Sequence, residues 1–255
     1  MNRTDLGFLD RMFHKIDLAD YNVLIVNQTN LGENLTSTLP NVRVVNSRNF
    51  GLSKSRNLAI KNSIKDICLI ADDDVVFLHD LGDKIIDCYN HHKRVDGIIF
   101  QTLTLTGRSY RDYPLGNLSK KELSNALSIE ITFRRSFLKT HKISFNELFG
   151  LGAKFSDTEN VHFLNDLQHK GAKILGAKDA IVSHKPFSSS DDIASERLMY
   201  ARGASFYKRF GPSAYIYALK YGLFLWRKGY ITFNQLKPKT QFLLKGIADF
   251  KSLYK

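Results

Sequence analysis

The feature that most constrains the fold is an apolar, β-branched run that ends in three consecutive aspartates. Residues 67–71 read Ile-Cys-Leu-Ile-Ala, and Asp72, Asp73 and Asp74 follow directly. A buried strand cannot hold these charges, so the carboxylates should emerge at the carboxyl edge of a sheet, where open α/β folds place their ligands. Two aspartates one residue apart can hold Mg²⁺ or Mn²⁺ while a nucleotide diphosphate supplies further oxygens. The plainer interpretation is a strand followed by an acidic turn.

Apolar spacing along the rest of the chain predicts alternating strands and helices, which is typical of an α/β fold with a mainly parallel central sheet. Strands are expected over residues 22–27, 42–46, 66–71, 96–103, 128–133, 173–176 and 180–183. Helices are expected over residues 5–16, 53–64, 81–91, 158–169, 193–209, 213–226 and 233–250. A stretch rich in serine and aspartate at 188–192 predicts a boundary between an α/β core of residues 1–190 and a helical extension of residues 191–255.

A second motif precedes the aspartates. Residues 49–57 read N-x-G-x-S-x-x-R-N, in which Gly51 allows a tight turn and Ser53 is suited to cap a helix. Arg56 and Asn57 then fall in the first turns of that helix, where a cation faces the approaching acidic loop. The chain thus has this motif, then a hydrophobic strand, and then D-x-D. The order and spacing of the three resemble those of the GT-A glycosyltransferases of family 2, which use nucleotide-diphospho sugars.

The resemblance extends across residues 20–210. Residues 149–163 resemble the family's glycine-rich acceptor loop and the "ED" helix that follows it, and residues 180–186 resemble a final core strand ending in a histidine. Gly150 and Gly152 would let the backbone approach the sugar or the acceptor closely. The resemblance implies a GT-A fold, a Rossmann-like sheet flanked by helices, here with a basic, aromatic C-terminal helical extension.

The chain departs from the family at the catalytic carboxylate. Where many relatives have Glu-Asp, this chain has Glu159 and Asn160. An amide cannot accept a proton, so the base must be Glu159 or Asp157. The implied reaction is an inverting transfer: the carboxylate removes a proton from an acceptor hydroxyl that attacks the anomeric carbon, while the metal neutralises the departing diphosphate. The plainer role of Glu159 is a carboxylate that favours a helix dipole.

The resemblance also implies a donor site that draws on several segments. Asp74 matches the metal-ligand position of D-x-D, and Asp72 matches the position that contacts the ribose or bridges to the metal. His184 lies where some relatives place a third ligand of Mn²⁺ or Mg²⁺, although a lone histidine at a strand end is more often a structural hydrogen-bonding group. Asn27 and Gln28 would reach the nucleotide base, and Arg56 would pair with the carboxylates or the diphosphate. Asp73 is the remaining residue of the implied donor site.

The start of the chain carries a further expectation. Relatives begin with a strand that ends in a short turn contacting the nucleotide base, and residues 1–4 read like that turn without the strand. We therefore expect the reading frame to start upstream, since without that strand the sheet would lack one of its inner members.

Composition agrees with a soluble enzyme. The 255 residues are 43% hydrophobic and 24% charged, which suffices for a buried core. No stretch is long and apolar enough to span a bilayer, and no signal peptide opens the chain. Two cysteines fit a reducing cytoplasm rather than a disulfide framework.

The formal net charge is +12, and basic residues dominate the C-terminal part. From Arg197 onward Asp249 is the single acid, whereas the cations are Arg197, Arg202, Lys208, Arg209, Lys220, Arg227, Lys228, Lys237, Lys239, Lys245, Lys251 and Lys255. Aromatic residues interleave with them. Cationic helices with aromatic side chains suit an anionic membrane surface, so we expect peripheral attachment at the inner face of the cell membrane. The alternative is that the aromatics pack the extension and the lysines are merely solvated.

Two other functions fit parts of the pattern. Residues 72–76 satisfy the D-x-D-x-(T/V) pattern of haloacid dehalogenase-like phosphatases, with Asp72 as nucleophile, but that family places the motif on its first strand. Its later residues are only loosely matched by Lys185, Asp191 and Asp192. A nucleic-acid-binding protein would explain the charge, yet no recognition motif is present. We favour a metal-dependent transferase that uses a UDP-sugar and a glycan or lipid-linked acceptor in capsule or lipopolysaccharide synthesis, without a nucleic-acid partner.

Overall fold

The computed structural model describes residues 2–30, 34–111, 113–185 and 193–253. The chain divides into two units. The first consists of Met1–Phe50, Lys54–Phe145 and Phe163–Pro186, and the second of Gly51–Ser53, Asn146–His162 and Phe187–Lys255. The boundary predicted at 188–192 lies outside the described residues, and the division at residue 190 stays a prediction.

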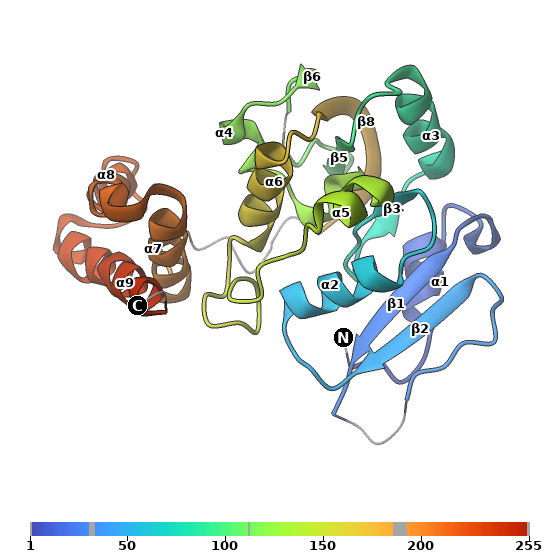
Figure 1. Ribbon diagram of the computed structural model, residues 1–255, viewed down its shortest axis with the longest axis horizontal. Coiled ribbons are helices and arrows are strands. Elements are labelled where there is room, and N and C mark those ends of the chain that lie inside the picture. The colour runs from blue at the N-terminus through green and yellow to red at the C-terminus, as the bar shows by residue number, and fades with distance from the viewer. Residues whose placement is uncertain (1, 31–33, 112, 186–192, 254–255) are drawn as a thin grey trace. The chain divides into compact units, whose positions relative to one another are not determined.

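Helices and strands are interspersed up to residue 184, as predicted for an α/β fold (Figure 1), although several strands follow one another directly. In chain order they are α1 (Phe8–Phe13), β1 (Val23–Gln28), β2 (Val42–Ser47), α2 (Leu52–Asn62), β3 (Ile67–Leu69), β4 (Val76–Phe77), α3 (Leu81–His91), β5 (Gly97–Thr104), β6 (Gly116–Asn117), α4 (Lys120–Leu123), β7 (Ile131–Arg134), α5 (Arg135–His141), α6 (Glu159–His169) and β8 (Ile174–His184). The β-branched and aromatic residues of β1, β2 and β5 favour strands, whereas α3 repeats apolar residues at helical spacing.

The strands of the first unit form two sheets. β1 and β2 pair in parallel. The other sheet has the order β3-β7-β5-β8-β4, and β6 also pairs with β8. Within it β5 and β8 are parallel, whereas β3–β7, β4–β8, β5–β7 and β6–β8 are antiparallel. The two longest ladders, β1–β2 and β5–β8, are thus parallel, which agrees with the predicted class.

One continuous strand replaces the two strands predicted at 173–176 and 180–183. In the β5–β8 ladder Ile99 pairs with Gly176, and Gln101 already pairs with Ala180, so β8 carries extra residues between these points. Such a bulge keeps the strand in the sheet while it bends. The amide of Gln101 donates to Ala177 O at 2.9 Å inside the bulge. Residues 177–179, which lie between the two predicted strands, belong to an irregular part of one strand.

Other predicted elements are shorter in the structure. The helix expected at 5–16 is confirmed only over Phe8–Phe13. The strand expected at 128–133 begins only at Ile131, because Ser128–Glu130 form a 3₁₀ turn. The strand before the aspartates ends at Leu69 rather than at residue 71. Short elements such as β4 and β6 were not predicted, since two-residue strands leave no periodic pattern.

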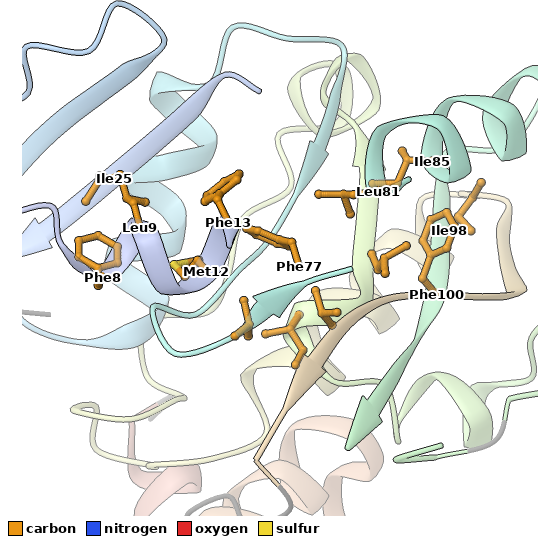
Figure 2. Packing of buried hydrophobic residues seen from close by; sticks show 14 of the residues in the cluster. Phe8, Leu9, Met12, Phe13, Ile25, Phe77, Leu81, Ile85, Ile98 and Phe100 are labelled. Carbon is orange, nitrogen blue, oxygen red and sulfur yellow. The ribbon is translucent and has the colours of Figure 1, made fainter. Parts of the chain in front are cut away.

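β5 lies at the centre of the first unit's core, because both of its faces are buried. Ile98 and Phe100 point into a hydrophobic cluster shared with side chains of α1, β1, β4 and α3 (Figure 2). Ile99 belongs to a second cluster, which also contains Phe133 of β7 and Phe163 of α6. Successive strand residues point to opposite faces, so this alternation covers the sheet on both sides. Polar and charged loops are therefore confined to its edges.

The helices of the second unit confirm the three that were predicted near the C-terminus. They are α7 (Glu196–Phe210), α8 (Ala214–Arg227) and α9 (Phe233–Ser252), and they pack together (Figure 1). Among the described residues no helix is both long and apolar enough to cross a membrane.

Two glycines bring α7 and α9 into backbone contact. A Cβ atom built on Gly203 of α7 would lie 2.0 Å from the carbonyl oxygen of Leu243, and one built on Gly246 of α9 would lie 2.0 Å from that of Tyr200. Real Cβ atoms do not approach so closely. Small residues of this kind let helix backbones approach, which fixes how the two helices cross.

The glycine-rich segment 146–162 packs against the same helices. Phe149 and Phe155 have no exposed surface, and each ring centroid lies 5.7 Å from that of Phe250 in α9. Ala201 and Ala204 of α7 complete this cluster. Buried aromatic rings provide much of the apolar area of a small core. The C-terminal helices therefore support the loop that was expected to carry the catalytic carboxylate.

Candidate functional site

The three aspartates lie in the loop between β3 and β4 of the first unit. Val75, directly after them, is fully buried and anchors the far end of the loop. The side chains of Asp72, Asp73 and Asp74 are 41, 29 and 48% exposed. The loop thus presents carboxylates at the sheet edge, as the sequence predicted, and each of the three has a different partner.

Asp72 faces Arg56 of α2. The guanidinium Nη2 lies 3.4 Å from Asp72 Oδ1, which is a loose contact. Arg56 is only 7% exposed, and its guanidinium lies 5.4 Å from the ring centroid of Phe145. The neighbouring Asn57 bonds both backbone groups of Phe145, at 2.9 Å to its oxygen and 2.7 Å from its nitrogen. The N-terminal half of α2 therefore holds a buried cation beside the acidic loop.

Asp74 faces His184, the last residue of β8. His184 Nε2 lies 3.4 Å from Asp74 Oδ1, and Nδ1 lies 2.7 Å from Lys185 O. A carbonyl oxygen can only accept, so Nδ1 must carry the hydrogen, and in the neutral ring Nε2 is then an acceptor. Two acceptors so close repel each other unless a proton or a metal ion lies between them. A bond from Nδ1 to a backbone carbonyl, as here to Lys185 O, is the kind that orients an imidazole whose Nε2 binds a metal.

Asp73 pairs with Arg3, a contact that the sequence did not predict. Arg3 Nη2 and Nε lie 2.6 and 2.8 Å from Asp73 Oδ2. The backbone of this segment is held in turn by β1, since Arg3 N donates to Asn27 Oδ1 at 2.9 Å and Asn2 N donates to Gln28 O at 2.8 Å. Arg3 therefore ties the middle aspartate to the first strand and leaves the outer two to face other groups.

Asn27 and Gln28, which were expected to contact a nucleotide base, use their amides within the protein. Asn27 is fully buried, and its Nδ2 donates to Arg3 O at 3.0 Å and to Asn46 Oδ1 at 3.2 Å. Gln28 Nε2 donates to Asn49 O at 2.6 Å. The amide of Asn27 is therefore enclosed within the protein, and the base contacts expected of the two residues stay predictions. Their structural role is to hold the segments that contain Arg3, Asn46 and Asn49.

In the second unit the glycine-rich loop is fastened to the start of α2. Leu52 N donates to Leu151 O at 2.8 Å, and Ser53 Oγ donates to Phe149 O at 2.6 Å. Ser53 was predicted to cap α2, but the helix already begins at Leu52 and the hydroxyl serves the loop instead. Because both bonds come from the first turn of a helix, the loop backbone is held in one position.

Gly150 and Gly152 are required by this arrangement. Their φ angles are +96° and +79°, in the region that favours glycine. A Cβ on Gly152 would lie 3.1 Å from Gly51 Cα, and one on Gly150 would lie 3.3 Å from Glu159 Cγ. The approach of these glycines to a sugar or an acceptor stays a prediction. The structure gives a second reason for glycine at both positions, namely the close packing of the loop against Gly51 and against the side chain of Glu159.

Glu159 begins α6 and lies beside Gly150. It is 7% exposed, and its position at the helix N-terminus places the carboxylate near the positive end of the dipole. The preceding residue, Thr158, has a φ angle of +67°, which a β-branched residue adopts only under strain of about 1–3 kcal/mol. Strained backbone of this kind is typical of segments that hold a functional side chain in place.

Asp157, the other candidate base, interacts with arginines of α7. Burial raises the pKa of this carboxyl above its usual value, although Arg202 and Arg197 oppose the shift. Burial also lowers the pKa of Arg202, which Asp157 counteracts. Arg197 additionally donates to the carbonyl of the adjacent Ser156. These contacts give Asp157 a structural task, since they join the loop to the helical part of the unit.

His162 lies one turn after Glu159 and is a buried neutral histidine. It is 2% exposed, its ring centroid lies 4.3 Å from that of Phe149, and among the described residues its Nε2 has no hydrogen-bond partner. Burial lowers the pKa of His162 from 6.5 to about 3, and the nearby charges of Lys208 and Arg209 act in the same direction. The unfolded chain therefore binds a proton here that the folded chain excludes.

This burial predicts a specific loss of stability in acid. The folded-state pKa of His162 lies below the unfolded value. The contribution of the neutral His162 to the stability of the fold is therefore present above about pH 6.5 and is lost as the pH falls toward 3. His162→Leu should remove about 1.4 kcal/mol per pH unit of this dependence between roughly pH 6 and pH 4. Urea unfolding of both proteins across this range measures the difference, with exposed His14→Gln as control. Equal slopes in wild type and His162→Leu would contradict the burial of a neutral imidazole.

The side chains of Asp74 and His184 in the first unit are of the kind that bind a divalent cation. Among the described residues no three histidine, cysteine, aspartate or glutamate side chains form a ready cluster. Asp74 Oδ1 nonetheless lies 3.4 Å from His184 Nε2. Two neighbouring ligands of one ion, with bonds of about 2.1 Å, lie about 3 Å apart, so the observed separation is close to that of a ligand pair. Carboxylate oxygen with imidazole nitrogen suits Mn²⁺, and a nucleotide diphosphate fills further positions in such sites. These residues therefore fit a cation that is shared with a ligand.

We compared the chain with known protein families and with curated protein sequences. The family model described as "Glycosyl transferase family 2" matches residues 8–157, a range that includes Arg56, the aspartate loop and Gly150 but ends before Glu159 and His184. No curated protein sequence matches the chain significantly.

Solved structures share the fold at low sequence identity. S. aureus TarS 1-349 in complex with UDP-GlcNAc has a TM-score of 0.58 at 15% identity, over 95% of this chain and 75% of that one. The mannosyltransferase PcManGT from Pyrobaculum calidifontis in complex with GDP-Man and Mn²⁺ has a TM-score of 0.57 at 12% identity, over 96% and 82%. S. aureus TarS 1-349 alone has a TM-score of 0.54 at 15% identity, over 78% of this chain. The chain spans 60% of that TarS 1-349 chain and 36% of a longer TarS chain.

The fold predicted from the sequence is confirmed, since the family model covers more than half of the 255 residues and the structural neighbours share the α/β architecture. The chain belongs to glycosyl transferase family 2 and has the GT-A fold.

Proposed function

We propose that this protein is a metal-dependent, inverting glycosyltransferase that moves a sugar from a nucleotide-diphospho-sugar to a hydroxyl group. The observation that carries this proposal is the pair of contacts made by the outer aspartates, Asp72 with Arg56 and Asp74 with His184, both at 3.4 Å. They place a cation and a histidine at the two carboxylates of a D-x-D loop, in a chain of the matching family.

The donor binds to the first unit through its diphosphate. Asp74 and His184 would hold Mn²⁺ or Mg²⁺, with Asp72 contacting the ribose or the metal, and the ion would neutralise charge on the departing diphosphate. Arg56 adds a fixed positive charge from the protein itself. TarS has been solved with UDP and with UDP-GlcNAc, and PcManGT with GDP-Man and Mn²⁺. Their nucleotide-sugar ligands support this class of donor, and we propose a UDP-sugar.

The base is Glu159. Its carboxylate accepts the proton of an acceptor hydroxyl while that oxygen bonds to the anomeric carbon and the bond from this carbon to the diphosphate oxygen breaks. The nucleoside diphosphate leaves with the bonding electrons, and the sugar inverts its configuration. Gly150 gives the Glu159 side chain its space, and Thr158 fixes the helix start.

The acceptor is a glycan or a lipid-linked saccharide of a cell-surface polysaccharide, reached at the inner face of the membrane. The strongly basic C-terminal helices support this location, since anionic lipids attract such segments. The phosphatase alternative gains no support, because its motif residue Asp72 faces an arginine and the chain belongs to another family. Its further candidates Asp191 and Asp192 lie outside the described residues.

Calorimetric titration of UDP, GDP, CDP and ADP, with and without Mn²⁺, tests the donor site. We expect one nucleotide to bind with Mn²⁺, and Asp74→Asn and His184→Gln to weaken that binding by about 10- to 100-fold, because each removes a proposed ligand. Exposed Asp87→Asn on α3 is the matched control and should bind as wild type. Binding that is independent of Mn²⁺, or unchanged in Asp74→Asn, would contradict the metal site.

The same titration tests Arg3. Arg3→Gln should weaken Mn²⁺-dependent nucleotide binding by about tenfold, because Asp73 would then lose its anchor and the loop its fixed geometry. The thermal midpoint should change little, since both side chains are partly exposed and such pairs contribute at most about 1 kcal/mol. Exposed Arg11→Gln on α1 controls for the lost charge. An affinity equal to that of wild type would show that Arg3 does not position the loop.

A further inference from the structure

Helix α8 carries its large apolar side chains on the outside. Its buried face consists mainly of small residues, namely Ala214, Ala218, Gly222 and Leu225. Its exposed stripe consists of Ile216, Leu219, Leu223 and Trp226, which are 56, 59, 46 and 41% exposed. Spacings of three and four residues place this stripe on one face of the helix. A water-facing helix has the opposite arrangement, with polar residues outside, so this face is suited to an apolar environment.

The apolar surface continues beyond the end of α8. Phe233, the first residue of α9, is 67% exposed, and its ring centroid lies 5.6 Å from that of Trp226 in an edge-to-face arrangement. Tyr230 between the two helices is 56% exposed. Scattered apolar residues are ordinary on a protein surface, but a contiguous patch marks an interaction site. We call α8 and these two residues the α8 face.

The charge around the α8 face has one sign. Between Arg197 and Ala248 the sequence contains no aspartate or glutamate. Lys220 and Arg227 lie on the exposed side of α8, and Lys228 follows directly. Charge complementarity therefore points to an anionic occupant with an apolar interior, which is the chemistry of a lipid surface.

We propose that the α8 face docks on an anionic lipid bilayer, with α8 lying in the plane of the interface and its apolar stripe among the acyl chains. The helix has 14 residues and is thus about 21 Å long, too short for a hydrocarbon core of about 30 Å. A second copy of the chain is a poorer occupant, because a symmetric contact would bring the same cations together on both sides. The inference rests on the proposed function only in placing the acceptor at a membrane.

Trp226 is the single tryptophan of the chain and lies on the α8 face, so its fluorescence reports on docking in the unmodified protein. Phosphatidylglycerol–phosphatidylcholine vesicles should shift its emission to shorter wavelength, and brominated acyl chains should quench it. Pure phosphatidylcholine vesicles should bind at least about tenfold more weakly, since each basic residue near an anionic surface strengthens binding about fivefold. Absence of a shift, or an equal shift with duplex DNA, would overturn the proposal.

A pair of variants tests the face directly. Leu219→Glu with Leu223→Glu should reduce vesicle binding at least about tenfold by co-sedimentation. The matched control is Ile64→Glu with Ile86→Glu, which alters two isoleucines that are 55 and 53% exposed in the first unit and should bind as wild type. A wild-type dimer without lipid that becomes monomeric in the α8 variant would overturn the proposal in favour of a second copy. No nucleotide is needed, so lipid docking and the donor site can each fail without the other.

Discussion

Replacing Glu159 with glutamine is expected to lower kcat by about 10²- to 10⁴-fold. The amide keeps the size of the side chain beside Gly150 but cannot accept a proton from the attacking hydroxyl. Nucleotide affinity, measured by calorimetry, should remain within about twofold, because the proposed donor contacts come from other residues. Sugar transfer measured with the donor identified by titration gives kcat for the variant and the wild type.

Asp157→Asn is the informative comparison, since sequence alone left both carboxylates as candidates. We expect it to lower thermal stability, because it leaves the half-buried Arg202 without its opposite charge, while kcat per folded molecule stays within a few-fold of wild type. A large fall in kcat for Asp157→Asn, together with an active Glu159→Gln, would reverse the assignment of the base.

Gly246→Ala is expected to lower the free energy of unfolding by about 2–3 kcal/mol. The added methyl group would meet the carbonyl oxygen of Tyr200 at 2.0 Å and the nitrogen of Ala204 at 3.0 Å, so α7 and α9 would have to separate. Alanine is the better helix former by about 1 kcal/mol, so the same change at an open helix position would stabilise the protein. A loss of stability in Gly246→Ala would therefore indicate that the two backbones touch, whereas a gain would indicate that they do not.

Ala248→Ser provides the control for this substitution. It also adds one heavy atom to α9, but on the exposed side, and should change stability by less than about 0.5 kcal/mol. Urea unfolding of both variants measures the difference. Equal stability of Gly246→Ala and wild type would show that the helices lie farther apart than the structure has them.

Local patterns sufficed for the parts of the site that depend on neighbouring residues in the chain. The apolar run before Asp72 predicted a strand edge with exposed carboxylates, and the motif around Arg56 predicted a cation on a helix facing them; both are found in the structure. The family resemblance identified His184, and the structure brings its ring to Asp74. Each of these features is carried by a short motif whose spacing has a direct geometric meaning.

Other contacts could not be read from the sequence because they join distant segments. Arg3 and Asp73 are 70 residues apart, and nothing local distinguishes Arg3 from any surface arginine. The family resemblance assigned Asn27 to the nucleotide, whereas in the structure this residue is buried and its amide bonds to the protein. The bulge in β8 was missed for a similar reason, since only the register with β5 shows that one strand continues through it.

The aromatic cluster that joins Phe149 and Phe155 to Phe250 makes the C-terminal helices inseparable from the loop that begins at residue 146. A chimaera that replaced only these helices would leave two phenylalanine rings without their packing partners. Exchange of these helices between relatives would therefore have to transfer both segments together. The helical tail and this loop thus behave as one unit of inheritance, although a stretch that contains α6 and β8 separates them in the chain.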